Sequence, residues 1–346
     1  MSIFKLSKLK TPIIQAPMAG GLNTPALASA VANAGGVGSF GFAYSTPERI
    51  AEDLKATKEL TDGFLNANFF VFEAISLPSS KHQTAALEAL IELQFGGDYS
   101  LVIPEAPFFP NLDAQLDPIW HHKPDALTFH FGVPSESIIR KAHSLGIAVG
   151  ITATNKDEGI AIEKAGADFL VGQGIEAGGH RGVFNSKSND ESLTLDKLIG
   201  ELSGSTKLEI AAAGGIMNGG DVRAALKLGA CAAQMGTAFL CCDEAGTPKT
   251  YRKFLLNEHD RKTSFTAAFS GRPARGIENQ FMQLMDKKPI LPFPVQNTVT
   301  GAIRKLAVKA NDGEYQSLWA GQSFNKIRAM AARDLMRTLS KEIAAG

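Results

Sequence analysis

The chain has 346 residues, and its 35 Lys and Arg balance its 35 Asp and Glu, so the formal net charge is zero. Proteins that bind nucleic acids or anionic membranes usually carry excess positive charge, which this chain does not have, so we exclude both classes. The three cysteines, Cys231, Cys241 and Cys242, form no disulfide framework and no CxxC metal motif, and no apolar run reaches the roughly 20 residues that span a bilayer. We therefore expect a cytoplasmic protein without a metal site, whose cysteines pack in its core.

Between residues 12 and 240, short apolar runs alternate with longer segments of helical periodicity. The expected strands are Ile13–Met18, Gly36–Phe40, Phe64–Phe70, Ala126–Phe131, Ile147–Ala153, Asp168–Gly174, Leu208–Gly215 and Cys231–Thr237. The expected helices between them are Pro25–Ala34, Pro47–Leu60, Pro134–Leu145, Asn155–Ala165 and Gly220–Leu228. Such alternation is typical of parallel βα units, and eight strands predict an α/β fold of the (β/α)8 TIM barrel type. An open doubly wound sheet is the alternative, but Ala16–Gly21 lacks its GxGxxG motif.

The alternation ends near Asp243. Five prolines fall within residues 246–300, and a final amphipathic segment, Gln322–Ile343, is expected to be a helix. Because the last helix of a barrel must follow its eighth strand, the intervening segment is expected to be an insertion. We therefore predict a barrel in residues 1–242, a smaller and mostly helical lid over the barrel mouth in 243–317, and a helix that completes the barrel in 318–346.

Small and amide residues gather at the expected strand ends, where barrels carry their active sites. Gly214–Gly215 and Gly236–Thr237 follow the seventh and eighth strands, the usual place of a phosphate site in this fold. The amides of Asn68, Gln173 and Gln234 both donate and accept hydrogen bonds, which suits a flat heterocycle with mixed edges. We therefore expect flavin mononucleotide (FMN) in the barrel mouth. Enolate chemistry on a metal is less favoured, because no cluster of metal ligands lies near these strand ends.

His180 is the candidate catalytic residue. The glycines around it, Gly178, Gly179 and Gly182, predict a flexible loop at the barrel mouth, with no apolar helix face to bury the ring. An ordinary pKa of about 6.5 suits proton transfer near neutral pH, and a partly charged imidazole can hold an anionic substrate. His130, at the end of the fourth strand, is the competitor and is otherwise expected to form the pocket wall.

Three arginines lie near glycines and prolines in expected loops: Arg181, Arg272 and Arg275. Each could pair with a carboxylate or a phosphate. Arginines in such loops are more often solvated or used as caps. We therefore do not expect them to contact the substrate.

Several segments resemble the nitronate monooxygenases, formerly called 2-nitropropane dioxygenases. They are Thr11–Gly21, Gly172–Gly182, Ala212–Ile216 and Leu228–Leu240, and Thr266–Asn279 and Ser317–Gln322 extend the match over nearly the whole chain. The last two segments are specific to class I of that family. Residues 95–125 carry no resemblance.

The resemblance implies non-covalent FMN, bound by Asn68, Gln173, Gly178, Gly215, Gln234, Met235, Gly236 and Thr237. It also implies that His180 is the active-site base or holds an anion. The family oxidises alkyl nitronates such as propionate 3-nitronate with dioxygen, without a nicotinamide cofactor, and releases nitrite and a carbonyl compound. Detoxification of 3-nitropropionate is the role that this suggests.

Two other functions stay open from the sequence. Residues 176–180 are shared with flavin-dependent enoyl-acyl-carrier-protein reductases and NADH:quinone reductases, although these do not resemble the 266–279 segment. A flavin- or phosphate-binding regulator without turnover is a non-catalytic alternative, against which His180 argues. The oligomeric state is open as well, a homodimer included.

Overall fold

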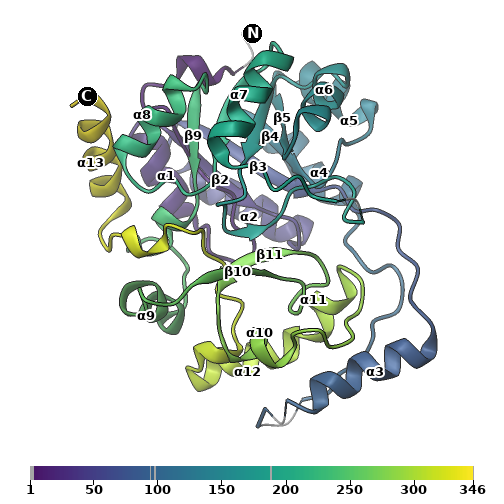
Figure 1. The fold of residues 1–346 in the computed structure, drawn as a ribbon. Helices are drawn as coiled ribbons and strands as arrows, with labels where there is room; N and C mark the ends of the chain where they lie inside the picture. Colours follow the sequence, from purple (N-terminus) through teal and green to yellow (C-terminus); the bar gives the residue numbers. More distant parts are fainter. Residues whose placement is uncertain (1–3, 94, 97–98, 188, 346) are drawn as a thin grey trace.

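The computed structural model describes residues 4–345 except 94, 97–98 and 188. Within these residues, eight parallel strands close into a barrel in the order β1-β2-β3-β4-β5-β6-β8-β9, and β9 pairs back onto β1 (Figure 1). Their bounds are β1 Ile13–Gln15, β2 Val37–Gly41, β3 Phe64–Phe70, β4 Ala126–His130, β5 Ala148–Ala153, β6 Phe169–Gln173, β8 Glu209–Ala213 and β9 Ala232–Met235. Each overlaps one expected run, so the predicted (β/α)8 barrel is confirmed.

Helices surround the barrel. Those that overlap predicted segments are α1 Pro25–Asn33, α2 Pro47–Lys58, α5 Glu136–Ser144, α6 Lys156–Lys164 and α8 Gly219–Lys227. Thr24 and Thr46 cap α1 and α2, because their hydroxyls accept from the backbone N–H groups of Leu27 and Arg49. The sequence did not predict α4 (Leu112–His122), which contains Pro118, or α7 (Leu195–Ser205), which contains two glycines. Both residue types oppose the helical pattern.

The terminal helix α13 spans Ala332–Ala344 and packs against α1 and α8 (Figure 1). The expected helix began ten residues earlier, at Gln322, and that part of the prediction is wrong. Residues before Ala332 instead hold a short 3-10 helix, Phe324–Lys326, and a bridge from Met330 to Cys242. Residues 322–331 do not form the expected helix because this segment crosses the barrel mouth, where Gly321 N donates to Thr237 Oγ1 at 3.0 Å. The division of the chain at residues 242 and 317 stays a prediction.

A second layer covers the barrel mouth and occupies the lower half of Figure 1. Its helices are α3 Ser80–Ile91, α9 Lys249–Asn257, α10 Gln280–Leu284, α11 Val295–Val299 and α12 Gly301–Ala310. It also contains a sheet in the order β10-β11-β7, with β10 Thr263–Thr266, β11 Ala274–Ile277 and β7 Gly179–His180. Thus the segment expected to be mostly helical also carries two strands. The helix α3, which follows β3 rather than β9, shares the apolar core of this layer through Ala86 and Leu90.

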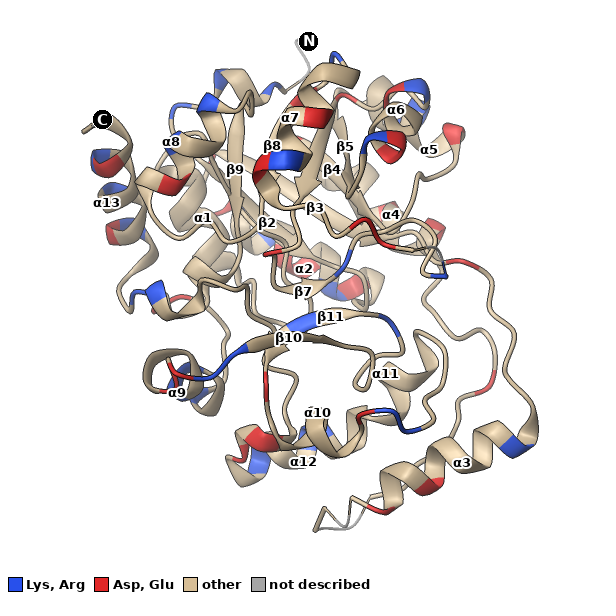
Figure 2. Ribbon diagram, in the orientation of Figure 1, with Lys and Arg blue, Asp and Glu red and all other residues tan. Residues whose placement is uncertain are grey.

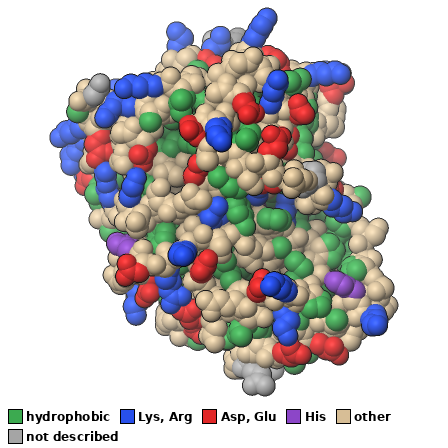
Figure 3. Space-filling view, viewed as in Figure 1, with side chains coloured by type: hydrophobic (Ala, Val, Ile, Leu, Met, Phe, Trp, Pro, Cys, Tyr) green, Lys and Arg blue, Asp and Glu red, His purple; other side chains and the backbone are tan. Residues whose placement is uncertain are grey.

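Charged residues lie mainly on the outer helices and loops, with both signs close together (Figure 2). The space-filling view shows Lys and Arg interspersed with Asp and Glu over one face (Figure 3). Among the residues that the structure describes, no helix is long and apolar enough to cross a membrane.

Candidate active site

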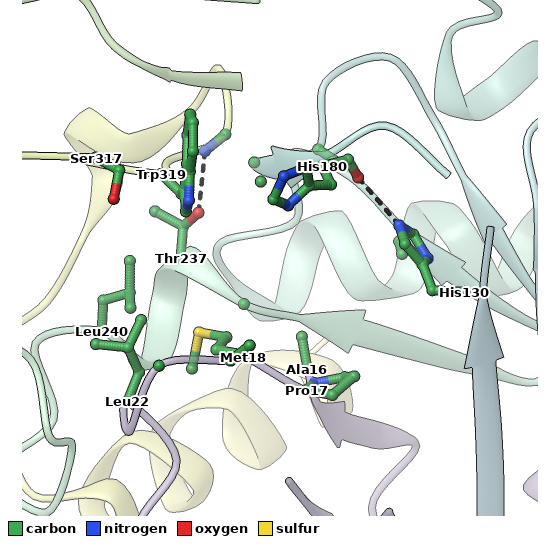
Figure 4. A pocket seen from close by; sticks show the side chains of 18 of the residues that line it. Ala16, Pro17, Met18, Leu22, His130, His180, Thr237, Leu240, Ser317 and Trp319 are labelled. Atoms are coloured by element: carbon green, nitrogen blue, oxygen red, sulfur yellow. Dashed lines mark hydrogen bonds between the residues drawn. The ribbon is translucent and has the colours of Figure 1, made fainter. Parts of the chain in front are cut away.

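A cavity of about 520 Å³ lies between the C-terminal ends of the barrel strands and the second layer. Barrel residues such as Asn68, His130 and Gln173 line it from one side, and residues of the second layer such as Tyr251 and Arg304 line it from the other. In Figure 4, His130 and His180 lie on one side of the cavity, and Thr237 and Leu240 lie on the other. The cavity is therefore placed where the fold carries its active sites.

Most of the predicted site residues meet in this cavity. Its lining includes Asn68, Gln173, Gly178, His180, Gly215, Gln234, Gly236 and Thr237. Met235 is the exception, because it is 1% exposed and packs in the barrel core, with its carbonyl accepting from Ala16 N at 2.8 Å. Its role as a cofactor contact stays a prediction.

Glycine backbone forms one end of the cavity. Gly214 and Gly215 have φ values of +135° and +68°, which other residues rarely adopt. A Cβ on Gly178 would lie 2.5 Å from Gly321 N, so the turn after β6 and the segment before α13 touch through their backbones. Together with Thr237, these residues form what we call the glycine cradle. Backbone packed so closely, without side chains, is the arrangement that admits a phosphate.

The amides along the barrel wall keep polar groups available to a ligand. Asn68 Nδ2 donates to Thr128 Oγ1 at 3.0 Å, and the Thr128 hydroxyl donates to Asn66 Oδ1 at 3.0 Å. The side-chain oxygen of Asn68 and its second N–H therefore remain available to bind a ligand. The side chain of Gln234 makes no hydrogen bond to any described residue, although it lines the cavity. Gln173 differs, since its Nε2 donates to His180 O at 3.0 Å and its Oε1 accepts from Gly182 N at 2.8 Å. That amide holds the His180 segment in place.

His180 belongs to a strand, not to the flexible loop that the sequence predicted. It pairs with Ala274 of β11, so the glycines around it form turns while its own backbone is fixed. Its Nε2 lies 2.9 Å from Ser270 Oγ. Ser270 Oγ donates its one hydrogen to Arg272 O at 2.9 Å, so Nε2 of His180 carries the hydrogen and donates to Ser270. Nδ1 is left as the unprotonated nitrogen.

His130 lines the same cavity and supports His180. Its Nε2 lies 3.2 Å from His180 O, which can only accept, so Nε2 carries the hydrogen. Nδ1 then accepts from Thr152 Oγ1 at 3.0 Å. The expectation that His130 forms the pocket wall is met by this geometry.

Burial keeps both imidazoles neutral. Burial first, together with the interactions of His130, Arg272 and Arg304, lowers the pKa of His180 to about 3. Burial likewise lowers the pKa of His130 to about 4. Four aromatic rings surround the His180 ring at centroid distances of 5.5–6.1 Å, those of Phe70, Phe131, Phe293 and Trp319. The expectation of a partly charged imidazole is therefore wrong, because aromatic residues from separate segments enclose the ring.

The three loop arginines are buried rather than solvated, which corrects the sequence prediction. Arg181 forms an ion pair with Asp190, with Nε 2.7 Å from Oδ2. Arg272 donates to Val183 O and stacks over Phe131, 3.9 Å from the ring centroid. Arg275 Nε donates to Ile175 O at 3.1 Å. None of the three is among the residues that line the cavity in the described part of the chain.

Two of the three cysteines are confirmed as buried core residues. Cys241 and Cys242 are fully buried, and burial raises the pKa of their thiols to about 11 and about 12. Cys231 is partly buried, and its pKa is also raised by burial. Within the described ranges, no group of three or more His, Cys, Asp and Glu could hold a metal ion.

Sequence reasoning missed the cavity residues that come from outside the strand ends. They include Tyr44 after β2, Tyr251 on α9, and Asn297, Arg304 and Lys305 on or near α11 and α12. One signal for the last group was available: Arg304–Lys305 interrupts an otherwise apolar stretch of the insertion.

The family model for nitronate monooxygenase matches residues 3–342. The chain belongs to the nitronate monooxygenase family. It is 37% identical to the nitronate monooxygenase of Paraburkholderia phytofirmans, over 99% of this chain and 94% of the relative. It is also 37% identical to that of Pseudomonas aeruginosa, over 98% of both chains.

Solved structures agree with this membership. A nitroalkane oxidase from Streptomyces ansochromogenes superimposes with a TM-score of 0.91 at 34% identity, over 98% of this chain and 97% of the other. FabK from Thermotoga maritima superimposes with a TM-score of 0.75 at 25% identity, over 98% and 94%. As a nitronate monooxygenase family member, the chain is an oxidoreductase that acts on a small molecule.

Proposed function

We propose that the protein is an FMN-dependent nitronate monooxygenase. It oxidises alkyl nitronates, of which propionate 3-nitronate is the type, with dioxygen. The bond between carbon and nitrogen breaks, nitrogen leaves as nitrite, and the carbon becomes a carbonyl group. The observation that supports this most is that His180 lines the same cavity as the glycine cradle, in a chain of this family.

The residues present fit FMN. The glycine cradle has the open backbone that a phosphate needs, and Gly215 adopts its positive φ of +68° there. Asn68 and Gln234 offer free amide groups to the edge of a heterocycle. Bound FMN would supply electron transfer between the nitronate and dioxygen. Gly178, Gly236 and Thr237 are proposed as further contacts, and Gln173 as a contact that also positions His180.

The chain itself supplies a shielded place for the substrate. The neutral His180 ring donates from Nε2 to Ser270, so its Nδ1 is free to accept a proton. An anion bound beside the ring would raise the pKa of His180. A nitronate is already deprotonated at carbon, so it does not need a strong base. His180 is therefore proposed to orient the anion and to hold a proton at Nδ1 when one is required. The aromatic rings around it exclude water.

The first test is the colour of the purified protein. It should be yellow, and acid should release its flavin as FMN. In air, propionate 3-nitronate should yield nitrite. A colourless protein that FMN does not reconstitute would contradict the proposal, and so would an FMN-loaded protein that forms no nitrite, which would favour a non-catalytic regulator.

An NAD(P)H-dependent reductase is the second candidate, because residues 176–180 resemble the segment that flavin-dependent enoyl reductases and quinone reductases share. The oxidised protein should be mixed with NADH or NADPH without oxygen. Our proposal expects the flavin colour to persist, whereas rapid bleaching would establish the reductase. The homodimer and the cytoplasmic location stay predictions.

A further inference from the structure

The cavity carries an unbalanced positive charge. Arg304 and Lys305 belong to its lining, and no Asp or Glu does among the residues described. His130 and His180 add no charge near neutral pH, because burial lowers the pKa of each. A cavity of this composition attracts anions.

Arg304 lies inside this cavity without a carboxylate partner. It extends from the first turn of α12, and its Nη2 donates to Asn297 O at 2.6 Å and to Asn297 Oδ1 at 2.9 Å. Its Nε is buried and has no hydrogen-bond partner. Within the described ranges, no carboxylate oxygen lies within 4.0 Å of the guanidinium, whereas Arg261, also half-buried, has two acidic partners. Arg304 is half-buried as a whole, and a cation with its Nε buried and no anion nearby is unfavourable, unless a ligand supplies the anion.

The phosphate of FMN does not account for this site. The glycine cradle lies against its own members and against Gly174, Glu176, Ala177, Ala320 and Ser323. Arg304 contacts Asn297, and its charge acts on Tyr44 and His180. Arg304 lines the same cavity as His180 and is absent from the close contacts of the cradle glycines, so we assign it to the substrate rather than to the phosphate.

We propose that Arg304, oriented by Asn297, binds a carboxylate that the substrate carries away from its nitronate carbon. The enzyme then selects nitronates with a second negative charge over simple alkyl nitronates. Arg304 is the specificity-determining residue, because Asn297 holds its Nη2 in place while its charge and its unpartnered Nε hydrogen stay available to a carboxylate oxygen. This inference rests on the proposed function, since it names the substrate class of the same cavity.

The kinetic test compares propionate 3-nitronate with propyl 1-nitronate, which lacks the carboxylate. The readout is the ratio of their kcat/KM values. In Arg304→Met, this ratio should fall roughly 10–100-fold, the range for a lost hydrogen bond to a charged group. Arg304→Lys keeps the charge but not the planar fork, so it should recover part of the ratio. Lys309→Met, an exposed change on the same helix, should leave the ratio as in the wild type.

Lys305→Met separates a specific contact from the general field of the cavity. Both side chains are cationic and line the cavity. If only the general positive field mattered, Lys305→Met and Arg304→Met would change the ratio of kcat/KM values equally. Our proposal expects Lys305→Met to change the ratio less than Arg304→Met. Equal losses for both nitronates in Arg304→Met would overturn it, because Arg304 would then bind the nitronate group. A drop in FMN content would also overturn it, because the partner would be the cofactor.

A binding measurement keeps this test independent of turnover. Calorimetric titration of the FMN-loaded protein with 3-nitropropionate at pH 7 probes the carboxylate while the nitro group is neutral. We expect the Kd to rise roughly 10–100-fold in Arg304→Met. The Kd of 1-nitropropane should change less. If the wild type binds 3-nitropropionate no more tightly than 1-nitropropane, the inference fails even where nitrite formation succeeds.

Discussion

Nε2 of His130 donates a hydrogen bond to the backbone carbonyl of His180, over 3.2 Å. The bond joins the end of β4 to the short strand β7, and Gln173 donates to the same oxygen at 3.0 Å. Two residues of the barrel wall thus fix the backbone of the candidate catalytic residue. Its side chain is fixed from the other layer, by Ser270.

Replacing His180 should affect turnover but not cofactor content. His180→Asn leaves the glycine cradle untouched, so FMN content should match the wild type. For a neutral nitroalkane, which must lose a proton, kcat/KM should fall roughly 10²–10⁴-fold. For a preformed nitronate the loss should be smaller and should appear chiefly in KM. Loss of FMN or of folding would indicate a structural role, and full activity would transfer the role to His130.

Stability should depend on pH through the two histidines. Their folded pKa values, about 3 and about 4, lie below the unfolded value of about 6.5. The unfolded chain therefore binds more protons, and stability falls as the pH drops from about 6.5 toward 4. Each ring should contribute roughly 1 kcal/mol per pH unit in this window. Calorimetric Tm values at pH 7.5 and 5.5 should differ less in His130→Gln than in the wild type. An equal difference would contradict these pKa values.

Gly178→Ala should disrupt the glycine cradle. The new Cβ would lie 2.5 Å from Ala320 C and Gly321 N, both backbone atoms that cannot rotate away. We expect most of the FMN to be lost, as measured by flavin absorbance per protein. Gly200→Ala is the matched control, because its Cβ meets nothing within 4 Å inside helix α7. It should keep FMN and gain about 0.5–1 kcal/mol of stability. Normal FMN content in Gly178→Ala would refute the assignment.

The thiols should be inert in the folded protein. Cys241 and Cys242 are fully buried with raised pKa values, and the thiolate is the reactive form. A chromogenic disulfide reagent at pH 8 should react with no more than Cys231 before denaturation and with all three cysteines after it. Rapid reaction of a second thiol in the native state would show that the region after β9 opens.

The barrel could be predicted because each strand is marked by a pattern of residues that are neighbours in the sequence. Runs such as Ala148–Ala153 are mostly apolar and are followed closely by Asn155, which caps the next helix, so the pattern alone marks them. The same holds for the strand-end residues that line the cavity, Asn68 and Gln173 among them.

The second layer could not be predicted in the same way. The pairing of His180 with Ala274 joins residues 94 positions apart, and no local pattern reports it. The low pKa of His180 has the same origin, since Phe70, Phe293 and Trp319 reach the ring from three distant segments. Arg304 was overlooked because the position of α12 over the barrel mouth depends on packing of the whole layer.

The sheet β10-β11-β7 couples the evolution of the covering layer to the position of His180. Its strands β10 and β11 come from the insertion after the barrel strands, and β7, which carries His180, pairs with β11, so any shift of β11 would also shift the histidine. A lineage cannot exchange the cover for one of different selectivity without also repositioning His180, the proposed substrate-binding group. Changes in substrate choice should therefore accumulate as single replacements on helices such as α12, which bear on the cavity but leave that sheet intact.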